Sequence, residues 1–151
     1  MSCRTQPNSV RRQHGIATVE LAIVAPILLL LLLGAAEMGR ALYQYNTLSK
    51  AVRDSARYYS SSVLNSNDIA GARNLVRYGQ IGVGTPLLPG VVNVIIPAPA
   101  VSANGTYVTV TGSYTFTFLP GNPLAGMIGW FGGAALPNPF VLTATSRMRA
   151  I

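Results

Sequence analysis

Few residues of this chain could carry acid–base, nucleophilic or metal chemistry, and they lie far apart. The candidates are Glu20, Glu37, Asp54, Asp68, His14 and Cys3. With its single histidine near the N-terminus and no second thiol, the sequence offers no Cys-His or Ser-His pair for the C-terminal part and no zinc pattern. Four scattered carboxylates are too few for a calcium or magnesium site. The sequence therefore predicts a protein that is not an enzyme and needs no metal or cofactor.

Glu20 is the one acid in an unusual place. It lies in the mostly apolar run of residues 16–36, which is long enough to cross a bilayer because a spanning helix needs roughly 17–25 residues. A charge at the bilayer centre costs about 2.5–3.5 kcal/mol on insertion scales. Glu20 is either an acid that reaches the headgroups, since it is about 7 Å into the span, or an acid with a partner charge.

The basic residues are placed as a topology signal. Residues 1–15 are polar, show no periodicity and are expected to form a flexible cytosolic leader. Arginines before the run predict a cytosolic N-terminus and an exported C-terminal part, although further basic residues after the run weaken that prediction. The net charge is +7, but aromatic and basic residues are not interleaved as in single-strand binders. We therefore expect no nucleic-acid partner.

Helical signals continue beyond the predicted transmembrane segment. Pro26 should kink the span, which membrane helices tolerate. From residue 37 to 63, apolar residues recur at three- and four-residue steps, which predicts that the same helix continues as an amphipathic one. A short second helix should follow, with Ser66 or Asn67 as its N-cap and Gly79 as its stop.

The exported residues 64–151 are predicted to form a small α/β domain. Strands are expected at Val91–Ile96, Thr106–Phe118 and Phe140–Arg149, with a bulge at Gly112. Asn104-Gly105 is a strong turn signal and predicts a hairpin between the first two strands. The predicted fold class is α+β and membrane-anchored: a long N-terminal helix, a short second helix, and a small antiparallel sheet packed on the long helix.

The connection from Leu119 to Pro139 is long, apolar and rich in glycine and proline. Loops of that length are usually functional or covered by another element. We expect it to fold back over the sheet and complete the core. The alternative is an exposed partner surface formed by Met127, Trp130 and Phe131.

The segment from Gly15 to Arg40 resembles the signature of TadE-like proteins, which are minor pilins of the tight-adherence (Flp-type) pilus machinery. In that pattern a basic leader, a glycine, four residues and a glutamate precede an apolar helix with a proline, and then a glycine, an acid and Gly-Arg. The matching residues here are Gly15, Glu20, Pro26, Gly34, Glu37, Gly39 and Arg40. The sequence departs from the pattern in having Leu21 where phenylalanine is frequent.

The resemblance implies a pilin-like fold and cleavage between Gly15 and Ile16 by a prepilin peptidase. Glycine suits this step because it offers the protease an extended, unhindered backbone. Cleavage would create an α-amino group at Ile16, with an ordinary pKa of about 7.7–8.0, one helical turn from Glu20. These opposite charges could pair within or between subunits and set the axial register during assembly.

The implied setting is the bacterial inner membrane, crossed once, with the C-terminal domain in the periplasm and, after assembly, in an extracellular pilus. Implied partners are the prepilin peptidase, other pilin and minor-pilin subunits, the inner-membrane assembly platform and the lipid bilayer. The resulting prediction is a minor pilin or pseudopilin that is assembled into, or primes, a Flp-type pilus.

Two alternatives remain open from the sequence. One is an unprocessed single-pass envelope protein. The other is a secreted binding module whose residues 1–36 are a cleaved signal peptide, with Gly34-Ala35-Ala36 as the cleavage site. Glu20 and Pro26 in the apolar region, and the length of that region, count against a signal peptide. For Glu37 and Arg40, which are three residues apart, we prefer the interpretation of a solvated pair of charges on the helix.

Overall fold

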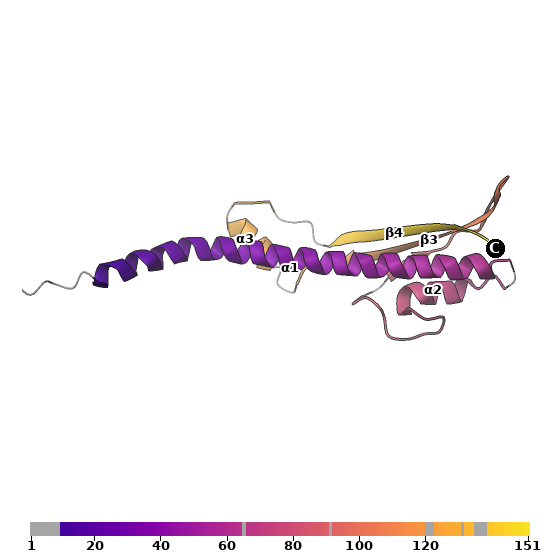
Figure 1. Ribbon diagram of the computed structural model, residues 1–151, viewed down its shortest axis with the longest axis horizontal. Coiled ribbons are helices and arrows are strands. Elements are labelled where there is room, and N and C mark those ends of the chain that lie inside the picture. Colours follow the sequence, from indigo (N-terminus) through magenta and orange to yellow (C-terminus); the bar gives the residue numbers. More distant parts are fainter. Residues whose placement is uncertain (1–9, 65, 91, 120–122, 131, 135–138) are drawn as a thin grey trace, which may run out of the picture.

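One helix runs through most of the length of the molecule (Figure 1). The structure, a computed structural model, describes residues 10–64, 66–90, 92–119, 123–130, 132–134 and 139–151. Helix α1 extends over Val10–Ser62, which is 53 residues and about 80 Å at 1.5 Å per residue. The predicted single continuous helix is therefore confirmed.

Helix α1 starts earlier than the sequence predicted. It begins at Val10, so residues 10–15 of the expected flexible leader are helical. The stretch from Val10 to His14 holds no proline or glycine, and its arginines and glutamine are good helix formers, so the helix extends backward from the apolar run. Pro26 lies inside α1, and the helix is unbroken on both sides of it.

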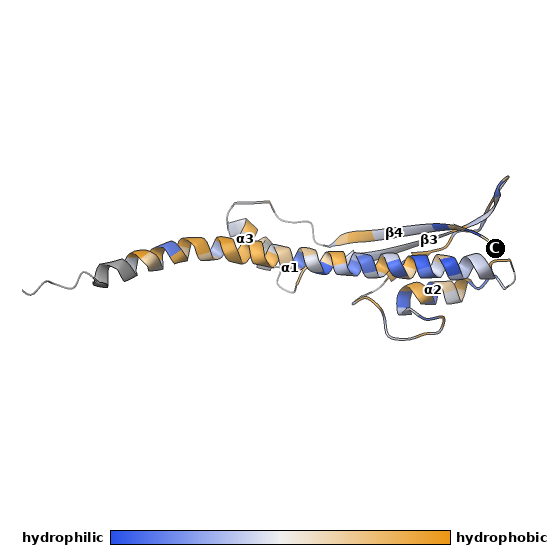
Figure 2. Ribbon diagram, in the orientation of Figure 1, coloured by the Kyte–Doolittle hydropathy of each residue, from blue (hydrophilic) through white to orange (hydrophobic). Residues whose placement is uncertain are grey.

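The two halves of α1 have different surroundings. Figure 2 shows a nearly continuous apolar surface in the N-terminal half and alternating polar and apolar residues in the C-terminal half. Within the described residues, one helix (Gly15–Ser62) is long and apolar enough to cross a membrane, and none of its most apolar window is buried inside the protein. The rest of the chain packs mainly on the other half.

The sheet has four antiparallel strands: β1 (Val92–Ile95), β2 (Ala100–Ser102), β3 (Gly105–Phe116) and β4 (Phe140–Arg149). Strand β3 is central, with β4 paired to residues 107–116 on one side and β1 and β2 in succession on the other. The predicted small antiparallel sheet on a long helix is confirmed.

Two details of the predicted sheet are wrong. Strand β2 was missed because it is only three exposed residues long, too short to show an alternating pattern. A tight turn does form here, but Ala103 and Asn104 make it, and it joins β2 to β3, with Ser102 opposite Gly105, the first residue of β3. Gly105 has a φ of 122°, a conformation that glycine adopts without strain.

Gly112 is not at a bulge. It pairs in regular register with Val94 of β1 and with Ala144 of β4. A Cβ at Gly112 would lie 2.8 Å from Val52 Cγ2 and 3.1 Å from Leu48 Cδ1. The glycine therefore allows α1 to approach the middle of the sheet closely.

The core lies between this face of the sheet and the C-terminal half of α1. Alternate residues of β3 are buried, and they meet residues spaced at helical period on α1. The largest fully buried side chains are Leu48, Val52, Ser55, Tyr59, Val76, Val108, Val110 and Phe116. The predicted alternation in β3 and the amphipathic stripe on α1 thus meet in one core.

The short second helix, α2 (Ile69–Tyr78), is present but is capped differently from the prediction. Asp68 is the N-cap: its carboxylate accepts the Gly71 N–H at 2.8 Å and the Tyr58 hydroxyl at 2.6 Å. These hydrogen bonds lower the pKa of Asp68 because they favour its charged form, and the bond from Tyr58 has the larger effect. Gly79 ends the helix with a φ of 71°, as predicted.

The long connection after β3 contains a third helix, α3 (Pro123–Trp130). It does not cover the sheet, so the expectation that this loop completes the core is wrong. Figure 1 shows α3 beside α1. It lies beyond the end of the sheet, toward the N-terminal end of α1. Ile128 of α3 and Gly133 lie across a cavity from Ile27 and Leu30 of α1.

The substitution Gly112→Ala should destabilise the domain, because the new methyl group overlaps Val52 and Leu48. Overpacking of this kind costs about 1–3 kcal/mol. Chemical denaturation of the full chain in detergent micelles would measure the change. Gly39→Ala is a matched control: it lies in α1 with no atom near its Cβ position and should be neutral or stabilising. Equal effects of both substitutions would contradict this account of Gly112.

Candidate assembly segment and helix–sheet junction

Gly15 and Ile16, the predicted cleavage residues, lie inside α1 and are exposed. No described atom outside the local helix lies within 4 Å of a Cβ placed at Gly15. The expectation of an extended backbone at this point is wrong, because the helix begins before it. A protease could approach from any side, but the first turns of α1 would have to unwind to fit an active site.

Glu20 lies one turn beyond Ile16 on the exposed surface of α1. Its neighbours Val19 and Leu21 are large, apolar and more than half exposed. Within the described part of the chain, the salt bridge present is that between Arg40 and Glu37, so Glu20 has no ionic partner there. In the uncleaved chain Ile16 carries a peptide nitrogen, and its proposed pairing with Glu20 stays a prediction.

Glu37 is the buried acid of the structure, with 4% of its surface exposed. Arg40 Nη1 lies 3.1 Å from each oxygen of its carboxylate. The backbone N–H of Leu119, which follows β3, donates to Glu37 Oε1 at 3.1 Å. A carboxylate that is taken out of water needs such donors. Here one donor lies in the same helix and the other lies just after strand β3.

Arg40 completes the junction between helix and sheet. Its Nη2 donates to the carbonyl oxygen of Thr117 at 2.8 Å. Its guanidinium carbon lies 5.0 Å from the ring centre of Phe116, within the range of cation–π attraction. Phe118 and Phe140 pack on Phe116 with ring centres 5.6 Å and 4.8 Å away. The Glu37–Arg40 pair thus fastens the end of β3 to α1.

The preferred interpretation of Glu37 and Arg40 as a solvated pair was therefore wrong. The i, i+3 spacing predicted their mutual contact correctly, but it carries no information about a strand that lies about eighty residues later. One signal was available. The pair lies where the apolar run ends, and residues 78–146 contain no charged residue, so the nearest charges for the end of β3 had to come from another element.

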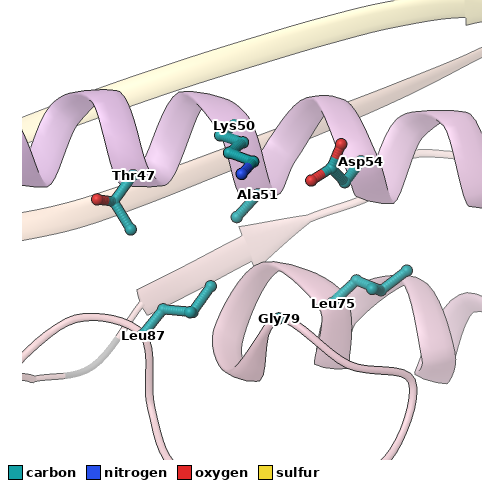
Figure 3. Close-up of a pocket in the computed structure, with 7 residues that line it drawn as sticks. All are labelled: Thr47, Lys50, Ala51, Asp54, Leu75, Gly79 and Leu87. Carbon is teal, nitrogen blue, oxygen red and sulfur yellow. The ribbon is translucent and has the colours of Figure 1, made fainter.

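A separate cavity of about 320 Å³ lies between α1, α2 and the loop after α2 (Figure 3). Lys50 and Asp54 of α1 lie on one side of it, opposite Leu75 and Leu87. Its described lining has neither histidine nor cysteine, and its Thr47 hydroxyl donates to a backbone carbonyl at 2.9 Å. This cavity offers no activated nucleophile. Among the described residues, no three potential ligand side chains group as a metal site.

The expected partner surface in the long connection is described only in part. Trp130, at the end of α3, is 73% exposed. Met127 lies in α3, but its side chain is outside the described part, and Phe131 lies outside the described residues altogether.

The fold and junction define an α+β protein whose candidate membrane helix continues into its folded domain. Residues 15–57 match the model of a family described as TadE-like protein, so over this segment the chain is TadE-like, as the motif predicted. The match includes Gly15, Glu20 and the Glu37–Arg40 pair, and it supports a protein associated with the tight-adherence pilus. No curated protein and no solved structure matches the chain.

Replacing Glu37 by glutamine should loosen the junction. Glutamine has about the same shape but removes the negative charge that Arg40 faces, and leaving a buried group poorly paired costs about 1–3 kcal/mol. Hydrogen exchange of the Leu119 amide, which donates to Glu37, should become faster. The matched control is exchange at Val110, which is fully buried in mid-strand and should change less. Unchanged protection at Leu119 would contradict this role of Glu37.

Proposed function

We propose that this protein is a minor pilin or pseudopilin that is processed after Gly15 and is assembled into, or primes, a Flp-type pilus. The observation that carries the proposal is the TadE-like match over residues 15–57. This match falls on a helix whose most apolar window is not buried inside the protein. The proposed partners are a prepilin peptidase, other pilin subunits and the inner-membrane assembly platform.

The uncovered half of α1 supports this function physically. Two of its large apolar side chains, Ile23 and Leu31, are more than 60% exposed. Exposed apolar surface of this extent needs another apolar surface, at about 25 cal/mol for each Å² removed from water. Lipid can supply it before assembly, and helices of neighbouring subunits can supply it in a filament.

Glu20 is proposed to select the axial position of the subunit. After cleavage, the new Ile16 ammonium would lie one turn away in the same subunit, or beside Glu20 of a neighbour. In an apolar helix bundle, a carboxylate that loses its partner charge costs about 3–5 kcal/mol. Subunits stacked out of register would pay that cost, so the pair would favour one register.

The proposed setting is a bacterial inner membrane, with the N-terminus in the cytosol and the α/β domain in the periplasm. The basic residues before the span favour this orientation, and the peptidase is proposed to act at the cytosolic face. In this arrangement the Glu37–Arg40 junction lies just outside the membrane, where the sheet begins.

The mature N-terminus in the native cell envelope tests the proposal. Mass spectrometry should find Ile16 as the first residue of the processed form. The Gly15→Ala variant should accumulate uncleaved, because a side chain at this position hinders the peptidase.

Glu20→Gln should be cleaved but should be largely lost from the pilus fraction, whereas Glu20→Asp, which keeps the charge, should assemble better.

Other N-termini would decide for the alternatives. A chain beginning at Glu37 would indicate a secreted module with a cleaved signal peptide, and an intact Met1 or Ser2 would leave an unprocessed membrane anchor. Normal assembly of Glu20→Gln would dismiss register selection by charge while leaving the processing step intact.

A further inference from the structure

Helix α3 lies against the part of α1 that is apolar enough to cross a membrane. An apolar cavity of about 320 Å³ separates the two helices, with Ile27 and Leu30 on one side and Ile128 and Gly133 on the other. Figure 2 shows α3 beside the apolar half of α1, away from its mixed half. The connection after β3 therefore returns toward the membrane side of the molecule.

The positions of Ile27 and Leu30 along α1 show how deep α3 would lie in a bilayer. If the hydrocarbon boundary on the domain side lies at residue 36, Leu30 is about 9 Å and Ile27 about 14 Å below it at 1.5 Å per residue. The hydrocarbon core is about 30 Å thick. Elements packed beside these two residues then lie within the nearer leaflet. With eight residues, α3 is too short to cross the bilayer and can only enter and return.

The composition of α3 does not suit an aqueous surface. Its sequence PLAGMIGW contains no charged residue and no polar face, and a helix that is apolar all round belongs in a core or a membrane. Among the residues of α3 whose burial is described, Ala125 and Ile128 are half-buried, whereas Gly126, Gly129 and Trp130 are exposed. Tryptophan is enriched where membranes meet water.

Backbone hydrogen bonds at the C-terminal end of α3 suit an apolar surrounding. The Gly132 N–H donates to the Gly129 carbonyl at 3.0 Å, and the Gly133 N–H donates to the Ile128 carbonyl at 2.9 Å. Gly132 has a φ of 76°, and these two bonds form a Schellman motif. They satisfy carbonyl groups that would otherwise need water, and lipid cannot provide such donors.

From these observations we propose that α3 is a membrane-dipping helix, embedded beside α1 in the leaflet nearer the α/β domain. Lipid acyl chains are the partner that covers its exposed side. When α1 crosses the bilayer, lipid surrounds the apolar half of α1, and α3 extends the surface of that half. The domain would then have two attachments to the membrane, α1 and α3, which restrict its tilt. The inference rests on insertion of α1 and on neither cleavage at Gly15 nor pilus assembly.

Trp130 is the only tryptophan of the chain, so the fluorescence of the unmodified protein reports on the end of α3. The full chain is reconstituted in vesicles of phosphatidylcholine and phosphatidylglycerol, with or without phosphatidylcholine brominated on its acyl chains. Brominated lipid should reduce Trp130 emission, whereas aqueous iodide should reduce it little. Two reference variants in a Trp130→Phe background set the scale: Leu31→Trp in the span, and Val101→Trp on the exposed strand β2.

Loss of Trp130 emission comparable to that of the Leu31→Trp variant supports the inference. Quenching by iodide at the level of the Val101→Trp variant would overturn it, and so would protection from both quenchers, which indicates cover by another protein copy. If the Leu31→Trp variant is itself not quenched by brominated lipid, α1 is not inserted, and both this inference and the proposed membrane setting fail. Ile128→Asp should abolish the lipid quenching of Trp130, whereas Ile128→Leu should retain it.

Discussion

A single helix in this protein has two different halves: one is apolar and exposed, and the other is packed on the α/β domain. Helix α1 is 53 residues long, but the α/β domain is large enough to cover only its C-terminal half. The buried residues of α1 therefore begin at Glu37 and continue through Ser60, and the segment before Glu37 is left for lipid or for other helices. The remaining features of the fold follow from where this change of surroundings occurs.

Two contacts fix the domain on its half of the helix. At the centre of the sheet, the absence of a side chain at Gly112 lets Leu48 and Val52 of α1 approach the strand. At the end of the sheet, the Glu37 carboxylate and the Arg40 guanidinium bind the backbone of residues 117 and 119. The first contact depends on shape and the second on charge. Together they define the distance and the axial position of the sheet relative to the apolar half.

The sequence predicted the features that depend on local periodicity. The continuous helix, the Gly79 stop and the alternation of Val108 and Val110 in β3 all follow from side-chain spacing within one element. The features it missed depend on contacts between distant residues. Examples are the burial of Glu37 by Leu119 and the position of α3 beside Ile27, neither of which leaves a periodic signal in the chain. Gly112 was singled out correctly but for a wrong reason, because a strand glycine can mark either a bulge or a close approach.

We propose that α1 passes from lipid to protein surroundings near Glu37. Spin labels at Ile23, Leu31 and Tyr43, three exposed positions of α1, would test it directly in the reconstituted full chain with Cys3 replaced by serine. Labels at Ile23 and Leu31 should collide mainly with oxygen, which concentrates in lipid. The label at Tyr43 should collide mainly with a water-soluble nickel chelate. Nickel accessibility at Leu31 equal to that at Tyr43 would contradict it.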